Sequence, residues 1–163
     1  MFITSIELKN TLVLGTLARL GGCLYVERRT PSGLKQEIAA IAQALGEGTT
    51  VALFPEGTTS NGDHVHPFKN SLFDAAIESR ADILPVCFRY STVNGNTIDT
   101  HNRDQVYYYG GANFLTHFGK LLALASVDVE VIPLKIIPIH ASDTRKDLAA
   151  RAHEEISAAY QGE

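Results

Sequence analysis

Short apolar runs alternate with helical repeats along this 163-residue chain, and that alternation constrains its fold more than any other feature. Strand-like runs occupy residues 2–6, 23–27, 49–54, 81–90 and 127–138. Helical patterns lie within residues 10–20, 31–46, 68–77, 114–125 and 142–159. The polar stretch 91–113 is expected to be a long surface excursion. The alternation predicts an α/β domain with a central, mostly parallel sheet flanked by helices.

Boundary residues mark the ends of two of these helices. Thr30 is the expected N-cap of the second helix, and Pro31 follows at the first helical position, where a missing N–H costs nothing. Gly46 or Gly48 is expected to end this helix. Ser142 is the expected N-cap of the last helix.

Two of the expected strands end directly before polar residues. In open α/β sheets the ligand crevice lies beyond the carboxyl ends of the strands. Strand exits after Val26 and Phe54 would therefore bring Arg28 and Glu56 to the same edge of the sheet. This edge is the expected functional edge.

The composition fits one globular domain over residues 1–163, because 45% of the residues are hydrophobic and 20% are charged. The formal net charge is −4, from 14 basic and 18 acidic residues. A mildly acidic chain argues against binding to nucleic acid through a broad basic surface. An anionic ligand would instead be bound by a few placed cations.

The two cysteines and the longest apolar run indicate the cellular setting. Cys23 and Cys87 lie far apart in apolar contexts, as expected for buried thiols in a reducing compartment. The apolar run within residues 10–20 is interrupted by Gly15 and Arg19 and is shorter than the roughly 20 residues of a membrane span. It can lie on a membrane surface but cannot cross the bilayer.

The segment FPEGTTSNGDHVHPFK, residues 54–69, concentrates polar groups at one strand exit. Gly57 and Gly62 have the spacing of a phosphate-binding P-loop, but Asp63 stands where that loop requires lysine. Ser60 lies in GTTSNG and not in the G-x-S-x-G turn of α/β-hydrolases. A hydrolase that uses Ser60 and one of the six histidines is kept only as an alternative.

Two histidines of this segment, His64 and His66, lie beside Asp63 and have the chemistry of metal ligands. The spacing fits two solvated histidines on a polar turn better. No metal site is therefore predicted.

The P-E-G-T-T turn places a carboxylate, Glu56, at the edge of the expected sheet. Gly57 permits close backbone approach, and the hydroxyls of Thr58 and Thr59 can donate to an oxygen-rich ligand. Alternatively, Glu56 pairs with Arg28 and the hydroxyls only close the turn. The residues alone leave both interpretations open.

Three blocks follow one another along the chain, namely GGCLYVERR (21–29), FPEGTTS (54–60) and ILPVCF (83–88). They resemble, in that order, the G-x-x-F-[IV]-x-R, F-P-E-G-T-[RT]-S and V-x-P-V blocks of the glycerolipid acyltransferases, the PlsC-type family of 1-acylglycerol-3-phosphate acyltransferase. YYGGANFLTHF and TRKDLAARAHEEI are similar to a bacterial branch that acylates lysophosphatidate or a lyso-ornithine lipid. The resemblance covers nearly the whole chain and implies a glycerol-3-phosphate acyltransferase-like fold.

The resemblance implies the transfer of a fatty acyl group to a lysolipid hydroxyl in phospholipid biosynthesis. The acyl donor would be a thioester of acyl carrier protein or coenzyme A, and no metal or redox cofactor would be needed. The protein would be peripheral at the cytoplasmic face of the inner membrane, where the apolar face of residues 10–20 helps it to sit. No nucleic-acid partner is expected.

The resemblance also assigns substrate-binding residues. Those matching the family's acceptor pocket are Arg28, Glu56, Gly57 and Thr58. Lys69 is a further candidate anion contact, although a solvated lysine at a helix start explains it equally well. Thr59 stands where many relatives have arginine, which removes one cation and weakens the expected preference for a doubly charged phosphate.

The family's catalytic H-x-x-x-x-D dyad does not occur in this chain, because none of the six histidines is followed five residues later by aspartate. No catalytic residue is therefore assigned. One interpretation is an N-terminally truncated acyltransferase domain that is inactive as the fragment alone. The alternative is a catalytically dead relative that keeps a pocket for lipid head groups.

Overall fold

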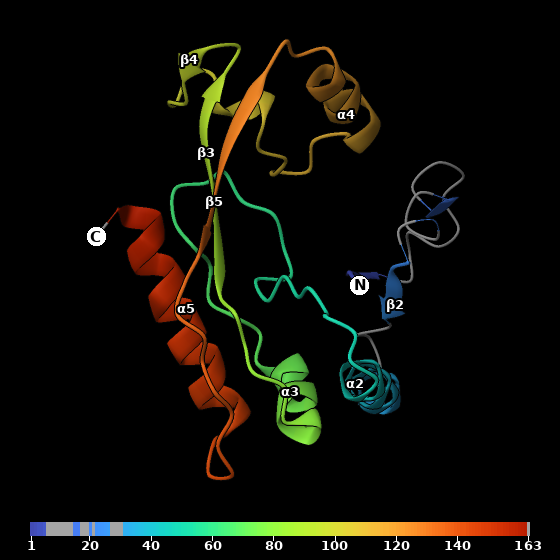
Figure 1. Ribbon diagram of the computed structural model, residues 1–163. Coiled ribbons are helices and arrows are strands. Elements are labelled where there is room, and N and C mark those ends of the chain that lie inside the picture. Colours follow the sequence, from blue (N-terminus) through green and yellow to red (C-terminus); the bar gives the residue numbers. More distant parts are fainter. Residues whose placement is uncertain (6–14, 17–19, 21, 27–30, 163) are drawn as a thin grey trace. The chain divides into compact units, whose positions relative to one another are not determined.

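The computed structural model describes residues 1–5, 15–16, 20, 22–26 and 31–162 (Figure 1). The described residues form two compact units. One unit comprises Met1–Pro55, Lys69–Ile83 and Pro138–Ala149. The other comprises Glu56–Phe68, Leu84–Ile137 and Ala150–Glu163. The expectation of one domain over residues 1–163 stays a prediction.

The first unit begins with two short parallel strands, as expected for the start of an α/β fold. β1 (Ile3–Ser5) pairs with β2 (Leu24–Val26), with Ile3 opposite Leu24. The first unit also contains α2 (Pro31–Gly46), the 3₁₀ helix η2 (Ser71–Phe73) and α3 (Asp74–Ser79). The predicted start at Pro31 and end at Gly46 are confirmed. Thr30, the expected N-cap, lies outside the described residues.

The core of the first unit forms where α2 packs against β1, η2 and α3. The buried cluster consists of Ile3, Ile38, Ile41, Leu72 and Ala75. Ile38 and Ile41 lie three residues apart and therefore on one face of α2. The apolar residues Leu34, Ile38, Ile41, Ala42 and Leu45 recur at helical spacing in the sequence, and all five belong to this core or pack against it.

The expected strand over residues 49–54 is reduced to a single bridge. Ala52 pairs in parallel with Phe2, its N–H donates to the Met1 carbonyl at 2.8 Å, and its carbonyl accepts from Ile3. The prediction of a buried strand is wrong at its end, since the side chain of Phe54 is 56% exposed. The backbone leaves the sheet after the bridge and continues as an irregular segment.

The sheet of the second unit is antiparallel. Its strand order is β4 (Asn96–Thr97), β3 (Val86–Val93) and β5 (Val127–Pro133), and β3 pairs with β5 from Val86↔Pro133 to Val93↔Val127 (Figure 1). The predicted mostly parallel sheet is therefore wrong for these strands, although the α/β class holds.

β3 and β5 run in opposite directions because the segment between them starts and finishes at the same end of the sheet. Asn94 follows β3 in a left-handed conformation with φ of 51°, and its side-chain Oδ1 accepts the N–H of Ala125 at 2.8 Å. The Asn94 N–H donates to the Ser126 carbonyl at 2.9 Å. These bonds place the start of β5 beside the end of β3, which is the hairpin-like arrangement of antiparallel strands.

Three helical segments complete the second unit and the chain. η3 (Arg103–Gln105) and α4 (Phe114–Leu122) lie in the connection between β4 and β5. α5 (Arg145–Gln161) begins in the first unit and ends in the second. The helix expected within residues 10–20 lies mostly outside the described residues. No helix in the described part of the chain is long and apolar enough to span a bilayer.

The N-cap of α5 is Thr144 and not the predicted Ser142. The Thr144 hydroxyl accepts the N–H of Asp147 at 3.3 Å, and the Asp147 carboxylate accepts the Thr144 N–H at 3.3 Å. This reciprocal pair is a capping box, which satisfies two backbone donors at once. Ser142 lies two residues too early to do so.

Candidate functional site: the Glu56 loop

Residues 56–68 form a closed loop, which we call the Glu56 loop. The segments at its two ends are adjacent, because the N–H of Lys69 donates to the carbonyl of Pro55 at 2.8 Å. Gly57 and Gly62 have φ of 61° and 79°, in the left-handed region that glycine adopts without steric cost. The two glycines therefore supply the reversals that fold the loop back on itself.

Glu56 is fixed within this loop by a backbone donor. Its carboxylate Oε2 accepts the N–H of His66 at 2.8 Å in a partly buried setting. A charged acceptor makes this bond stronger than a neutral one. The carboxylate of Glu56 is thus positioned by the far side of its own loop.

The hydroxyl groups that follow Glu56 differ in their roles. The Ser60 Oγ accepts the N–H of Gly62 at 3.2 Å and closes a local turn. The Thr58 hydroxyl lies at the limit of hydrogen bonding, 3.5 Å from the Thr59 carbonyl. Thr58 and Thr59 are exposed, so ligands in solution can reach both hydroxyls.

Side chains from distant parts of the second unit surround the loop. The Tyr160 hydroxyl donates to the Gly62 carbonyl at 2.6 Å, and the Tyr107 hydroxyl lies 3.3 Å from that of Tyr160. Arg103 forms an ion pair with Asp63. The pKa of Arg103 is raised above its ordinary value. Burial alone would lower this pKa, but the negative charge of Asp63 and its hydrogen bond to the guanidinium raise it by more.

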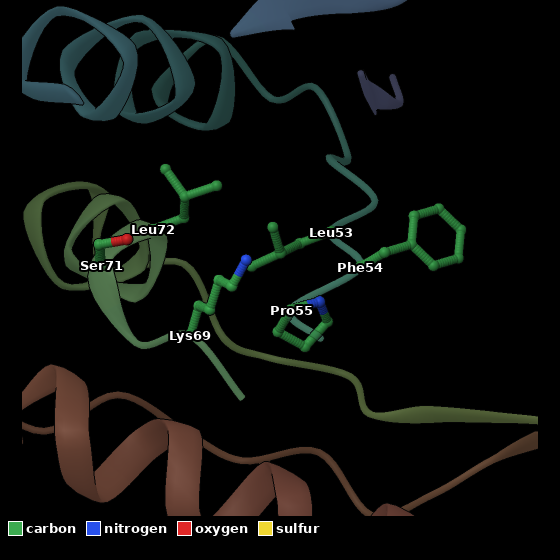
Figure 2. Close-up of a pocket in the computed structure, with 6 residues that line it drawn as sticks. All are labelled: Leu53, Phe54, Pro55, Lys69, Ser71 and Leu72. Atoms are coloured by element: carbon green, nitrogen blue, oxygen red, sulfur yellow. The ribbon is translucent and has the colours of Figure 1, made fainter. Parts of the chain in front are cut away.

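Lys69 lies in the first unit, beside a small hollow. The hollow is lined by Leu53, Phe54, Pro55, Lys69, Ser71 and Leu72 (Figure 2). Its volume is about 20 Å³, on the scale of a single water molecule. A lysolipid head group does not fit such a space, so this hollow is not an acceptor pocket in the state described.

The predicted site residues fall into three groups. Glu56, Gly57, Thr58 and Thr59 are consecutive in the Glu56 loop and belong to the second unit. Lys69 belongs to the first unit. Arg28 lies outside the described residues, so its pairing with Glu56 and its role in the pocket stay predictions.

The two histidines of the loop do not form a recognisable metal site. Their rings make an edge-on contact with centroids 4.8 Å apart. Among the residues that the structure describes, no cluster of three histidine, cysteine or acidic side chains could hold a metal ion. His66 instead holds the Glu56 carboxylate through its backbone N–H. The chemistry of its side chain does not indicate this role.

Sequence reasoning missed the tyrosines that contact the loop. Tyr107 lies in the stretch expected to be a surface excursion, and Tyr160 lies in the last helix. The bond from Tyr160 to Gly62 spans 98 residues, and no local pattern signals a contact of that range. The sequence singles out Gly62 only for its P-loop-like spacing from Gly57, and not for a contact with a tyrosine.

Comparisons with known proteins agree with this architecture. A family profile described as Acyltransferase matches residues 1–89. A lyso-ornithine lipid O-acyltransferase from Brucella abortus is 30% identical over 98% of this chain and 62% of its own length. A 1-acyl-sn-glycerol-3-phosphate acyltransferase from Neisseria gonorrhoeae is 27% identical over 96% of this chain and 59% of its own length.

The fold also matches a solved structure. The crystal structure of the 1-acyl-sn-glycerophosphate acyltransferase PlsC from Thermotoga maritima aligns with a TM-score of 0.63 and 16% identity. The alignment covers 99% of this chain and 55% of that chain. The expected PlsC-like α/β fold is thereby confirmed, and this chain spans little more than half the length of the PlsC chain. Since the family profile covers more than half of the sequence, the chain belongs to the acyltransferase family.

Proposed function

We propose that this chain provides the acceptor-binding part of an enzyme that transfers a fatty acyl group to a lysolipid hydroxyl in phospholipid biosynthesis. The main support is the family match over residues 1–89, which includes Arg28 and the whole Glu56 loop. The names of the relatives from Brucella and Neisseria describe acylation of lyso-ornithine lipid and of 1-acylglycerol 3-phosphate. Lysophosphatidate and lyso-ornithine lipid are therefore the acceptors to test.

The geometry of the Glu56 loop suits acceptor binding. Glu56 is held by the His66 N–H, and the exposed hydroxyls of Thr58 and Thr59 follow it directly. A loop fixed before the ligand arrives loses less conformational entropy on binding. Arg28 would add a guanidinium, which binds phosphate or carboxylate through two parallel hydrogen bonds.

In the proposed reaction the lysolipid hydroxyl attacks the thioester carbonyl of acyl carrier protein or coenzyme A. A new ester C–O bond forms, the C–S bond breaks, and the thiol leaves with a proton. A general base must take the hydroxyl proton, and the family's H-x-x-x-x-D pattern is absent from the 163 residues. The residues of this chain are proposed to bind the acceptor, with no metal or redox cofactor.

We further propose that the protein works peripherally at the cytoplasmic face of the inner membrane. The support is chemical, because lysolipid acceptors partition into membranes. The apolar pattern within residues 10–20 is the proposed contact and lies mostly outside the described residues.

A second candidate function is a non-catalytic module that binds lipid head groups. The observation that favours it is the missing dyad pattern combined with an ordered Glu56 loop. The two candidates predict the same binding and differ only in acyl transfer.

The experiment uses a short-chain lysophosphatidate below its micelle concentration and isothermal titration calorimetry. We expect the chain to bind, Arg28→Ala to weaken binding at least ten-fold, and the exposed-residue control Lys146→Ala to bind like wild type. A second preparation adds the in-frame coding sequence upstream of Met1 and is assayed with acyl-coenzyme A and acyl carrier protein thioesters. Transfer supports the enzyme, and binding without transfer supports the module. The absence of both overturns the proposal.

A further inference from the structure

The Glu56 loop is held by a contact that spans most of the sequence. Tyr160, near the end of α5, donates its hydroxyl proton to the Gly62 carbonyl at 2.6 Å across 98 residues. The Tyr107 hydroxyl lies 3.3 Å from the Tyr160 hydroxyl. All three residues belong to the second unit, and we call them the tyrosine clamp.

Gly62 is fitted closely to this clamp. A Cβ atom at position 62 would lie 2.3 Å from Cζ of Tyr107, well inside van der Waals contact. Its φ of 79° is also one that other residues rarely adopt. Any side chain at position 62 would therefore displace the Tyr107 ring that lies against the loop.

Burial keeps Tyr160 in the form that can donate. Burial raises the pKa of Tyr160 well above its ordinary value, and the hydrogen bond with Tyr107 raises it further. The charge of Glu56 contributes to the shift of the Tyr160 pKa in the same direction. A phenol is already protonated at neutral pH at its ordinary pKa, and the raised pKa of Tyr160 extends its ability to donate to higher pH.

A second contact from the same helix reaches the other end of the loop. His153 Nε2 lies 3.4 Å from the Val65 carbonyl, and the Phe68 ring meets the His153 ring edge-on with centroids 5.0 Å apart. His153 and Tyr160 are seven residues apart, so they lie two turns apart on one face of α5. One helix face thus contacts both the Gly62 turn and the segment next to His66.

We propose that Tyr160, Tyr107 and Gly62 are positioning residues that set the conformation of the Glu56 loop for the acyl acceptor. The proposal rests on the acceptor-binding function inferred above. The clamp reaches Glu56 only through the loop backbone. Gly62 and Val65 are both contacted by α5, and His66, which follows Val65, donates its N–H to Glu56. All clamp residues except Gly62 lie beyond the region that the family profile covers.

The test compares Tyr160→Phe, which removes one hydroxyl, with Tyr108→Phe. The ring of Tyr108 packs on Phe114 and His117, so its variant removes the same hydroxyl from a tyrosine with other partners and serves as a control. Amide hydrogen exchange is followed over residues 56–68. We expect exchange about five- to ten-fold faster in Tyr160→Phe, the equivalent of one lost hydrogen bond, and no change in Tyr108→Phe. Unchanged exchange in Tyr160→Phe overturns the clamp.

A glycine pair tests the same idea without altering α5. Gly62→Ala and Gly110→Ala both place alanine at a positive φ, but a Cβ at Gly110 meets nothing within 4 Å. We expect loop exchange to rise in Gly62→Ala only. Equal rises in exchange over residues 56–68 in the two variants would indicate a general loss of stability and contradict the clamp.

Affinity for short-chain lysophosphatidate separates the clamp from the proposed function. If wild type binds and Tyr160→Phe binds five- to ten-fold more weakly, with Tyr108→Phe unchanged, the positioning role is supported. A loosened loop with unchanged affinity overturns that role. If wild type does not bind but Tyr160→Phe still loosens the loop, the acceptor function is overturned, and with it the positioning role, while the contact itself stands.

Discussion

The carboxylate of Glu56 and the backbone N–H of His66 are joined by a 2.8 Å hydrogen bond across ten residues of loop. Glu56 is thereby held in place before any ligand binds. The histidine takes part through its main chain, so its side chain is not required for this contact. This hydrogen bond fixes the position of the carboxylate that we propose as part of the acceptor pocket.

The first prediction concerns the two histidine side chains. The double variant His64→Ala/His66→Ala keeps the backbone N–H that binds Glu56, so lysophosphatidate affinity should stay within about two-fold of wild type. Calorimetry with and without added zinc measures it. A zinc dependence in wild type that the double variant loses would contradict the account.

A second prediction separates the charge of Glu56 from its hydrogen bond. Glu56→Gln keeps an oxygen that can accept the His66 N–H, whereas Glu56→Ala removes the acceptor. Hydrogen exchange in residues 56–68 should rise several-fold in Glu56→Ala and little in Glu56→Gln, in keeping with one lost hydrogen bond. Glu155→Ala, on an exposed part of α5, is the control. Equal exchange in the alanine and glutamine variants would show that the bond does not hold the loop.

The third prediction concerns the start of α5. Thr144→Ala removes a capping-box hydroxyl and should lower the free energy of unfolding by about 1 kcal/mol. Ser142→Ala should change it by less than about 0.5 kcal/mol, the usual effect of a surface substitution. Urea unfolding of both variants measures the difference, and the reverse order would restore Ser142 as the cap.

These helix ends show what the sequence can and cannot decide. Pro31 and Gly46 bound α2 as predicted, because proline and glycine act through local backbone geometry. Ser142 is the predicted N-cap of α5, but Thr144 two residues later also carries a hydroxyl that can cap the helix. Reciprocal pairing with Asp147 decides between them, and that pairing is seen only in the structure.

The direction of the β3–β5 pair was the main error. Strand patterns in the sequence predict where strands lie. They do not show whether two strands run parallel or antiparallel, because that depends on the path of the segment between them. The Asn94-Gly95 dipeptide in that connection has φ of 51° and 76°, which fits a tight hairpin turn. This dipeptide is the local signal of the β3–β4 hairpin, and it lies within the stretch that the sequence predicts to be a surface excursion. The tyrosine clamp had no such local signal.

A fourth prediction follows from the pKa of Tyr160, which burial raises above its ordinary value. In the unfolded chain this phenol loses its proton near pH 10, while the folded protein retains it. Above that pH the unfolded state binds fewer protons, so the free energy of unfolding falls as pH rises. Tyr160→Phe removes this contribution and should lose less stability between pH 9 and 11. Parallel wild-type and variant curves from urea unfolding would contradict the assignment.

The most direct measurement of the central claim is acyl transfer to lysophosphatidate by the protein that includes the in-frame sequence upstream of Met1, compared between wild type, Glu56→Ala and Glu155→Ala. The account predicts transfer by wild type and Glu155→Ala, and at least a ten-fold higher KM for lysophosphatidate in Glu56→Ala. An unchanged KM for the acceptor in Glu56→Ala would contradict the assignment of the Glu56 loop as the wall of an acceptor pocket.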